Sequence, residues 1–198
     1  IKEYYQMRRP ETADSNILDL YIWLNCYPTW YFTNDKGLMW VAKSEDGQYY
    51  SSIPCCKDED LKECFLETQK YFNEVLQKKL VMYVVDRAAV DLLQLPEDEY
   101  VVVPDRTYAD YVYDAEKLRT FSGKKYHKKK NHLNAFKREY EGRYEFKFLS
   151  KKDEPEILDF LEDWKKHKSD TEEHEFIDSE AVGIKYILEH EEVFDYKI

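Results

Sequence analysis

The 198-residue chain is poor in glycine, and the phosphate-binding loops that depend on glycine are missing from it. It contains 5 glycines, and neither G-x-G-x-x-G nor G-x-x-x-x-G-K-[ST] occurs. We therefore expect neither the doubly wound dinucleotide-binding fold nor the P-loop fold. The printed residues include no signal peptide and no apolar run long enough to cross a bilayer. We expect a cytoplasmic protein that is not integral to a membrane, with peripheral attachment left open.

The sequence also lacks the spaced cysteine pairs of structural zinc sites. Its four cysteines are Cys26, Cys55, Cys56 and Cys64, and no C-x-x-C occurs among them. In the acidic tract of residues 170–178, Glu172-Glu173-His174-Glu175 lacks the i, i+4 spacing of helical metal ligands, and an acidic loop is the favoured interpretation. We expect reduced thiols, no metal site and no tightly bound cofactor.

Acidic residues are absent from one segment of an otherwise acidic chain. Residues 117–138 contain nine cations and no Asp or Glu, whereas the whole chain has a net charge of −11. Removing these nine positive charges leaves −20 for the remainder. Such a balance disfavours general nucleic-acid binding, stable DNA binding included. It indicates one surface suited to anions.

The first hundred residues alternate helical and extended patterns. The pattern predicts helices at residues 17–23, 58–79 and 88–93. It predicts strands at residues 29–32, 38–42, 49–53, 80–85 and 100–103. Asn34-Asp35-Lys36-Gly37 joins the first two strands as a hairpin turn. We interpret the aromatic residues of the early strands as core and cross-strand pairs: Trp30, Tyr31, Trp40, Tyr49 and Tyr50. This order indicates an α/β (α+β) chain with a mixed sheet flanked by helices.

The rest of the chain repeats part of that order. The pattern predicts helices at residues 115–121 and 124–140, one opening at Pro155, and one at 179–190. Strands are predicted at residues 144–149 and 193–198. Because strand, helix, helix and strand also follow one another earlier, we expect a second similar unit to begin near Tyr144. The chain begins with Ile1 and its last strand stops midway, which indicates a fragment of a longer protein.

One stretch resembles a known family. It comprises Tyr113-Asp114-Ala115-Glu116-Lys117-Leu118 and Gly123-Lys124-Lys125-Tyr126-His127-Lys128-Lys129-Lys130-Asn131-His132-Leu133-Asn134-Ala135-Phe136. Leu20-Tyr21-Ile22-Trp23, Asp110-Tyr111-Val112-Tyr113 and Trp164 match as well. The chain resembles soluble bacterial proteins related to the C-terminal domain of phosphatidylglycerol lysyltransferase. It departs from them at Lys130, where relatives usually carry Arg, a residue that grips phosphate through two bonds.

The resemblance implies a tandem pair of GNAT-like acyltransferase folds. Residues 1–143 would form the first domain, including the basic helix, and residues 144–198 the beginning of the second. Better-known relatives move an aminoacyl group from aminoacyl-tRNA onto a membrane lipid or a peptidoglycan precursor. The resemblance therefore implies acyl-CoA or aminoacyl-tRNA as the donor substrate. It also implies that this fragment is incomplete for catalysis.

The basic segment supplies the candidate anion-binding residues, which are Lys124, Lys125, Lys128, Lys129, Lys130 and Asn131. Lys128, Lys129 and Lys130 point in successive directions around a helix, so at most two of them face one ligand. A position near a helix N-terminus favours anions further. A phosphate-bearing small molecule, a lipid headgroup and tRNA all fit this surface. The alternative is a solvated helix face that balances the acidic remainder.

Three residues are candidates for acid–base chemistry. His127 and His132 lie five residues apart and share no helix face, and either suits the role of general base. Asp110 suits a cationic amino group or a neighbouring lysine. The competing interpretations are capping or hydrogen-bonding roles for the histidines and helix capping by the nearby Asp114.

Three functions remain open at this point. The first is direct transfer of an activated acyl group to an amine or hydroxyl, without a covalent enzyme intermediate, since no Ser, Cys and His triad is recognisable. The second is a non-catalytic binding protein for anionic lipid or a phosphorylated ligand. The third is an RNA-binding module, whose affinity would fall steeply with salt.

Overall fold

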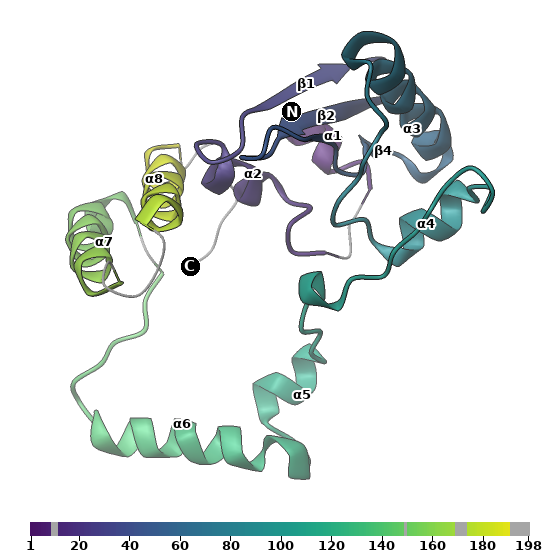
Figure 1. Ribbon diagram of the computed structural model, residues 1–198. Coiled ribbons are helices and arrows are strands. Elements are labelled where there is room, and N and C mark those ends of the chain that lie inside the picture. Colours follow the sequence, from purple (N-terminus) through teal and green to yellow (C-terminus); the bar gives the residue numbers. More distant parts are fainter. Residues whose placement is uncertain (9–11, 149, 169–173, 191–198) are drawn as a thin grey trace. The chain divides into compact units, whose positions relative to one another are not determined.

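The structure is a computed structural model that describes residues 1–8, 12–148, 150–168 and 174–190 (Figure 1). The strand predicted at residues 193–198 lies outside these residues. Contacts divide the described chain into two compact units. We call residues 1–108 and 150–190 the sheet unit, and residues 109–148 the basic-helix unit. The predicted boundary between residues 143 and 144 stays a prediction, and in the structure residues 150–190 group with the sheet.

Helices make up most of the regular structure. The α-helices are α1 (Lys2–Tyr5), α2 (Ile17–Trp23), α3 (Leu61–Lys70), α4 (Arg87–Leu93), α5 (Ala115–Thr120), α6 (His127–Glu139), α7 (Glu154–Lys168) and α8 (His174–Glu189). Short 3-10 turns are η1 (Asp58–Asp60), η3 (Arg106–Tyr108), η4 (Lys124–Tyr126) and η5 (Lys151–Asp153), and η2 (Tyr71–Leu76) is a π-helix. The strands are β1 (Thr29–Thr33), β2 (Gly37–Lys43), β3 (Tyr49–Tyr50) and β4 (Cys55–Cys56).

The sheet grows from the predicted hairpin. β1 pairs with β2 in an antiparallel ladder, and β3 and β4 both pair with β2. Asn34 sets the turn, because its side-chain oxygen accepts hydrogen bonds from the N–H groups of Lys36 at 2.9 Å and Gly37 at 2.8 Å. The parallel component of this mixed sheet is a single bridge between Ser51 and Met82. The α+β class is thus confirmed.

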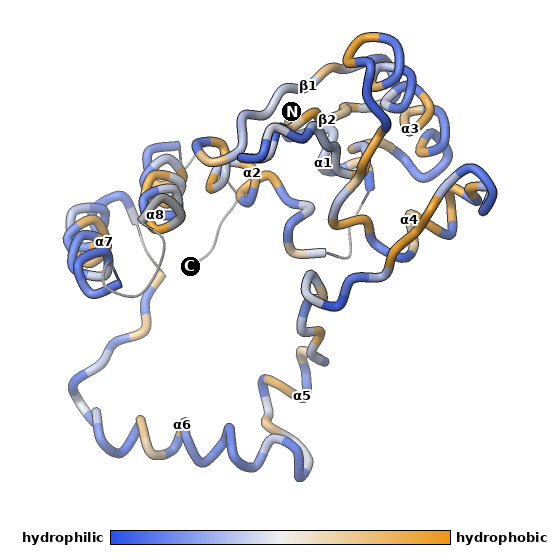
Figure 2. Tube along the Cα trace, viewed as in Figure 1, coloured by the Kyte–Doolittle hydropathy of each residue, from blue (hydrophilic) through white to orange (hydrophobic). Residues whose placement is uncertain are grey.

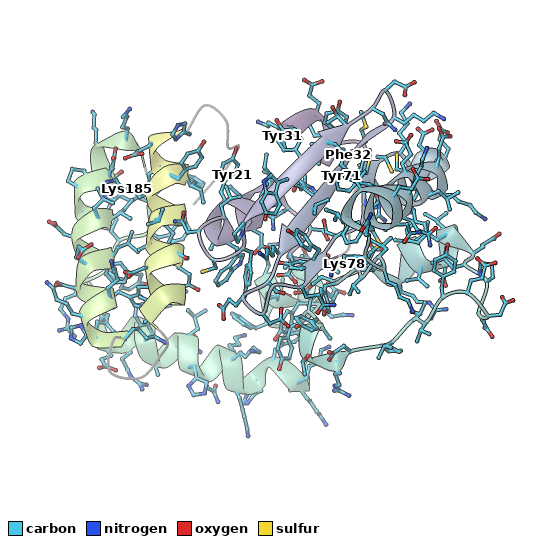
Figure 3. The ribbon with its side chains drawn as sticks, turned by 45° about the horizontal axis from the view of Figure 1, so that its top comes forward. Tyr21, Tyr31, Phe32, Tyr71, Lys78 and Lys185 are labelled. Carbon is cyan, nitrogen blue, oxygen red and sulfur yellow. The ribbon has the colours of Figure 1, made fainter. Side chains whose placement is uncertain are left out.

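The core of the sheet unit lies between β2, α3 and α4. Its buried cluster consists of Met39, Ile53, Cys56, Leu61, Cys64, Phe65, Ala89 and Leu93. Figure 2 shows the apolar colouring of β2 and α4 beside mixed colouring on α3. Phe32 of β1 stacks on Tyr71 of η2 with ring centroids 5.1 Å apart, and the two rings lie side by side in Figure 3. This packing of an edge strand on a helix end closes one side of the core.

A second packed layer joins α2, α7 and α8. Asn16 caps α2 by accepting hydrogen bonds from the N–H groups of two following residues at 2.8 and 3.0 Å. α8 lies between α7 and α2 (Figure 1). Gly183 permits the close approach, because a Cβ built there would lie 2.6 Å from the Cα of Ile22. Tyr21 and Tyr186 stack across the same contact at 4.6 Å.

One buried ion pair ties the N-terminal residues to α4. Arg8 donates to both oxygens of Asp86, at 3.4 and 2.8 Å, and Asp86 also caps α4 by accepting from the N–H of Ala89 at 2.7 Å. Burial alone raises the pKa of Asp86, but the hydrogen bonds from Arg8 and Ala89 outweigh burial and hold this pKa below its ordinary value. The folded state therefore favours the charged form of Asp86.

Three predicted strands are wrong. Residues 80–85 make only the bridge at Met82, and Val84 takes a left-handed conformation with φ 54° that interrupts any longer ladder. Residues 100–103 and 144–148 form no strand, because nothing in the described chain supplies a ladder for them. The predicted helix at 58–79 divides into η1, α3 and η2 and ends at Gln77.

The interpretation of the strand aromatics holds only in part. Tyr31 contacts Trp40 with centroids 5.6 Å apart, and Trp30 contacts Tyr49 at 6.4 Å, so the cross-strand pairs are present. Trp40 is buried, but Trp30 and Tyr31 are 51% and 54% exposed. These two aromatic residues lie at the surface because their strand, β1, is at the edge of the sheet.

Candidate anion-binding site

The basic-helix unit is built from α5, η4 and α6, and local interactions set its shape. Asp114 caps α5 by accepting from the N–H of Lys117 at 3.1 Å, which confirms the capping role. This backbone hydrogen bond and the Lys117 ammonium lower the pKa of Asp114. α5 ends where Phe121 (φ 48°) and Gly123 (φ 91°) adopt left-handed conformations, so the predicted break at Ser122-Gly123 is present.

One aromatic residue anchors the start of α6. Tyr126 is 3% exposed, and it meets Phe121 edge-on with centroids 6.4 Å apart. Further along, Phe136 stacks on Tyr140 at 4.8 Å and contacts Tyr144 at 5.1 Å. Phe136 and Tyr140 nevertheless remain 44% and 38% exposed. Stacking between neighbouring rings accounts for their contacts.

The nine cations of residues 117–138 fall into two groups. Lys117 and Arg119 are neutralised within α5, by Asp114 at 3.1 Å and by Glu116 at 2.7 Å. The remaining cations form no ion pair within the part of the chain that the structure describes: Lys124, Lys125, Lys128, Lys129, Lys130, Lys137 and Arg138. All seven are exposed. The second group therefore has charge to offer a ligand.

Aromatic rings hold two of these lysines in place. The ammonium of Lys129 lies over the ring of Tyr113, 5.6 Å from its centroid, and that of Lys125 lies over Tyr126 at 5.1 Å. Tyr113 precedes α5 and Lys129 lies in the first turn of α6, so the contact links the segment before α5 to the start of α6. We infer that it orients Lys129 and leaves its charge uncompensated.

The helix geometry sorts the predicted residues by face. Lys128 and His132 are four residues apart on one face, and His127 and Asn131 share another. α6 continues directly from η4, and the His127 N–H that begins α6 already donates to the C=O of Lys124. No side chain caps η4, so the N–H groups open to an anion are those at the start of η4. Asp110 lies in the extended segment before α5. The three candidate acid–base residues are exposed and come from separate elements or faces, and their catalytic role stays a prediction.

Two features of possible chemical interest escaped prediction. An open depression at the end of α6 is lined by Asn134, Lys137, Arg138, Glu141, Gly142 and Tyr144. The i, i+3, i+4 and i+7 spacing of the first four was the signal available in the sequence. In the sheet unit, burial and the charge of Asp14 raise the pKa of Asp19 to about 6, while a hydrogen bond from Trp23 Nε1 at 3.1 Å opposes the rise.

The comparison with known families decides the relationship of the chain. The sequence profile described as "Phosphatidylglycerol lysyltransferase, C-terminal" matches residues 6–188. The chain belongs to this family. The phosphatidylglycerol lysyltransferase C-terminal family is named for a transferase domain, and an α+β fold with a small antiparallel sheet is consistent with the GNAT-like fold expected for it. No helix in the described ranges is both long and apolar enough to span a bilayer.

Two similar proteins are longer than this chain. It is 28% identical over 100 residues to an uncharacterized protein of Mycoplasmoides gallisepticum, covering 50% of this chain and 32% of that protein. A crystal structure of a conserved protein of unknown function from Bacteroides thetaiotaomicron matches with a TM-score of 0.79 and 24% identity. This match covers 97% of the present chain and 64% of the Bacteroides chain, and it supports the fold alone. The chain thus spans less than two thirds of both relatives.

Proposed function

We propose that this chain is part of an acyl- or aminoacyltransferase in which α6 binds a phosphate group of the donor or the acceptor. The family match over residues 6–188 supports the class of reaction. Acyl-CoA and aminoacyl-tRNA both carry phosphate groups in addition to the activated carbonyl. A lipid headgroup and a nucleotide-linked cell-wall precursor offer it on the acceptor side.

A difference in ion pairing among the cations of the basic-helix unit supports the phosphate role of α6. Lys117 and Arg119 have acidic partners, whereas the other seven cations of residues 117–138 form no ion pair among the described residues. Like charges at this density cost stability unless a ligand neutralises them. Because η4, which leads directly into α6, also lacks a side-chain cap, an anion at its start meets both the charges of Lys124 and Lys125 and open N–H groups.

In the proposed reaction an amine or hydroxyl of the acceptor attacks the activated carbonyl directly. A general base takes the proton of the attacking group, and the thiol of CoA or the ribose hydroxyl of tRNA leaves. His127, His132 and Asp110 are the candidates for that base. His127 is the first of them to test, because it opens α6 beside the proposed phosphate site.

The experiment replaces Lys128, Lys129 and Lys130 together by Ala. A matched control replaces Lys62, Lys70 and Lys79, which are exposed residues of the sheet unit, and makes the same change in net charge. Each protein is incubated with labelled acetyl-CoA, with aminoacyl-tRNA and with phosphatidylglycerol vesicles, and both binding and transfer of label are measured. We expect the α6 variant to bind at least tenfold more weakly and the control to behave like the unaltered chain.

The alternative function is a binding protein without chemistry. Binding that depends on the α6 lysines without any transfer of label, also in the longer protein, would favour that alternative. If the two triple variants behave alike in every assay, the phosphate role of α6 is wrong.

A further inference from the structure

β1 is an edge of the sheet. Within the residues that the structure describes, it pairs with β2 alone, through a register from Thr29↔Ala42 to Thr33↔Leu38. An edge strand presents a row of backbone N–H and C=O groups that another strand is able to pair with.

The register determines which backbone groups of β1 face away from β2. Lys43 N–H donates to Pro28 C=O at 3.0 Å, and Asn34 N–H donates to Gly37 C=O at 3.1 Å. Hydrogen-bonded and non-bonded pairs alternate along an antiparallel ladder. The bonded residues of β1 are therefore Trp30 and Phe32, and the N–H and C=O groups of the residues between them point outward. These outward residues are Thr29, Tyr31 and Thr33.

Nothing in the sequence of β1 discourages pairing at this edge. Residues 26–34 contain no charged side chain, and the strand itself has neither proline nor a bulge. Natural edge strands commonly use one of these devices against association. Trp30 and Tyr31 are 51% and 54% exposed, so the strand adds aromatic surface on both faces of the sheet.

The sequence of β1 is also nearly symmetric about its centre. It reads Thr-Trp-Tyr-Phe-Thr, with Tyr31 in the middle, aromatic residues on each side and threonine at both ends. We propose that β1 pairs antiparallel with the β1 strand of a second copy of this chain, about a twofold axis through Tyr31.

The proposed register agrees with the backbone directions. The twofold axis places Tyr31 opposite Tyr31 of the second copy and Thr29 opposite its Thr33. Every residue brought into a hydrogen-bonded pair is one whose backbone groups point outward, and three such pairs supply about six hydrogen bonds. Trp30 faces the second copy's Phe32 on the other side of the sheet, an aromatic pairing that stabilises antiparallel strands.

The first test measures association of the unaltered chain against concentration and salt by analytical ultracentrifugation. A five-residue edge makes a small interface, so we expect a weak dimer whose fraction rises across the micromolar to millimolar range. Each copy carries a charge of −11, and salt screens the repulsion between copies. We expect the dimer to strengthen with salt. A species that is monomeric at every concentration, or one that salt dissociates, overturns the proposal.

The second test compares Tyr31→Pro with Tyr31→Val. The N–H of Tyr31 takes no part in the β1–β2 ladder, so proline removes an outward donor and leaves that ladder intact. Valine keeps the donor and removes the same ring. We expect Tyr31→Pro to abolish the dimer and Tyr31→Val to weaken it less than tenfold. Dimers that persist in Tyr31→Pro place the contact on another surface and refute the pairing.

A third measurement uses the unaltered chain, so its result does not depend on whether the proline variant folds. Amide hydrogen exchange of Tyr31 and Thr33 slows as the concentration of the unaltered chain rises, because their N–H groups enter the ladder between copies. The amides of Trp30 and Phe32, bonded to β2 in either state, serve as the internal control. Exchange at Tyr31 that is independent of concentration contradicts the proposal even if a dimer is present.

Discussion

The sheet unit and the basic-helix unit are stabilised in different ways, although one chain forms both. The core cluster of the sheet unit brings together side chains, mainly of β2, α3 and α4, that lie far apart in sequence. Among the described residues 109–148, Tyr126 is the single buried side chain. Caps, ring contacts and ion pairs within a few residues stabilise the basic-helix unit. Distant contacts give a unit its core, whereas local contacts leave its charged surface open to ligands.

The largest expected effect tests this contrast with one residue type. Leu61→Ala removes a side chain that is 1% exposed in the core, and Leu118→Ala removes one that is 37% exposed on α5. We expect Leu61→Ala to lower the free energy of unfolding by about 2–5 kcal/mol and Leu118→Ala by less than about 1 kcal/mol. Urea unfolding followed by fluorescence measures both. Equal losses would show that the basic-helix unit has a core of its own.

A smaller effect is expected when either of two glycines is replaced by alanine. Gly183→Ala brings a Cβ against the backbone of Ile22, which cannot move aside as a side chain can, and we expect a loss of about 1–3 kcal/mol. Gly142→Ala meets no atom but must adopt φ +70°, and we expect about 1 kcal/mol, limited to the end of α6. Thermal unfolding and helical circular dichroism report the two costs. If Gly183→Ala stabilises the chain, α8 does not lie against α2 in this way.

The smallest effect depends on pH. Burial and Asp14 raise the pKa of Asp19 to about 6, so the folded chain holds this proton more tightly than the unfolded chain. Protonated Asp19 therefore stabilises the folded chain fully below about pH 4, and this stabilisation is lost as pH rises through about 6. We expect Asp19→Asn, which still accepts from Trp23, to be more stable than the unaltered chain at pH 7.5 by on the order of 1 kcal/mol after solvent screening. A difference that stays the same at pH 4 would exclude Asp19 as its source.

Local signals in the sequence predicted local structure well. The turn at Asn34, the cap at Asp114 and the break at Ser122-Gly123 are all present, because each depends on residues within a few positions. The five cations of α6 were likewise visible in the sequence, since they lie in a stretch, residues 117–138, that contains nine cations and no acid. Their lack of ion pairs required the structure.

The strands show where this reasoning fails. Residues 80–85 and 100–103 are rich in β-branched residues, yet a strand needs a partner that propensity does not supply. Val101 is 89% exposed and Met82 forms one bridge. The converse error is β4, where Cys55 and Cys56 pair with β2 although no strand was predicted at these two residues. In each case, pairing with a segment distant in sequence determined whether a strand formed.

The joint between α5 and α6 has a consequence for how sequences of this kind can vary. Phe121 and Gly123 bend the chain there, and α6 follows within a few residues. One residue added to or removed from this joint turns α6 by about 100° about its own axis. Lys129 would then leave the ring of Tyr113, and a different set of side chains would occupy the ligand-facing side. The number of residues between Phe121 and Tyr126 should therefore tolerate less change than their identity.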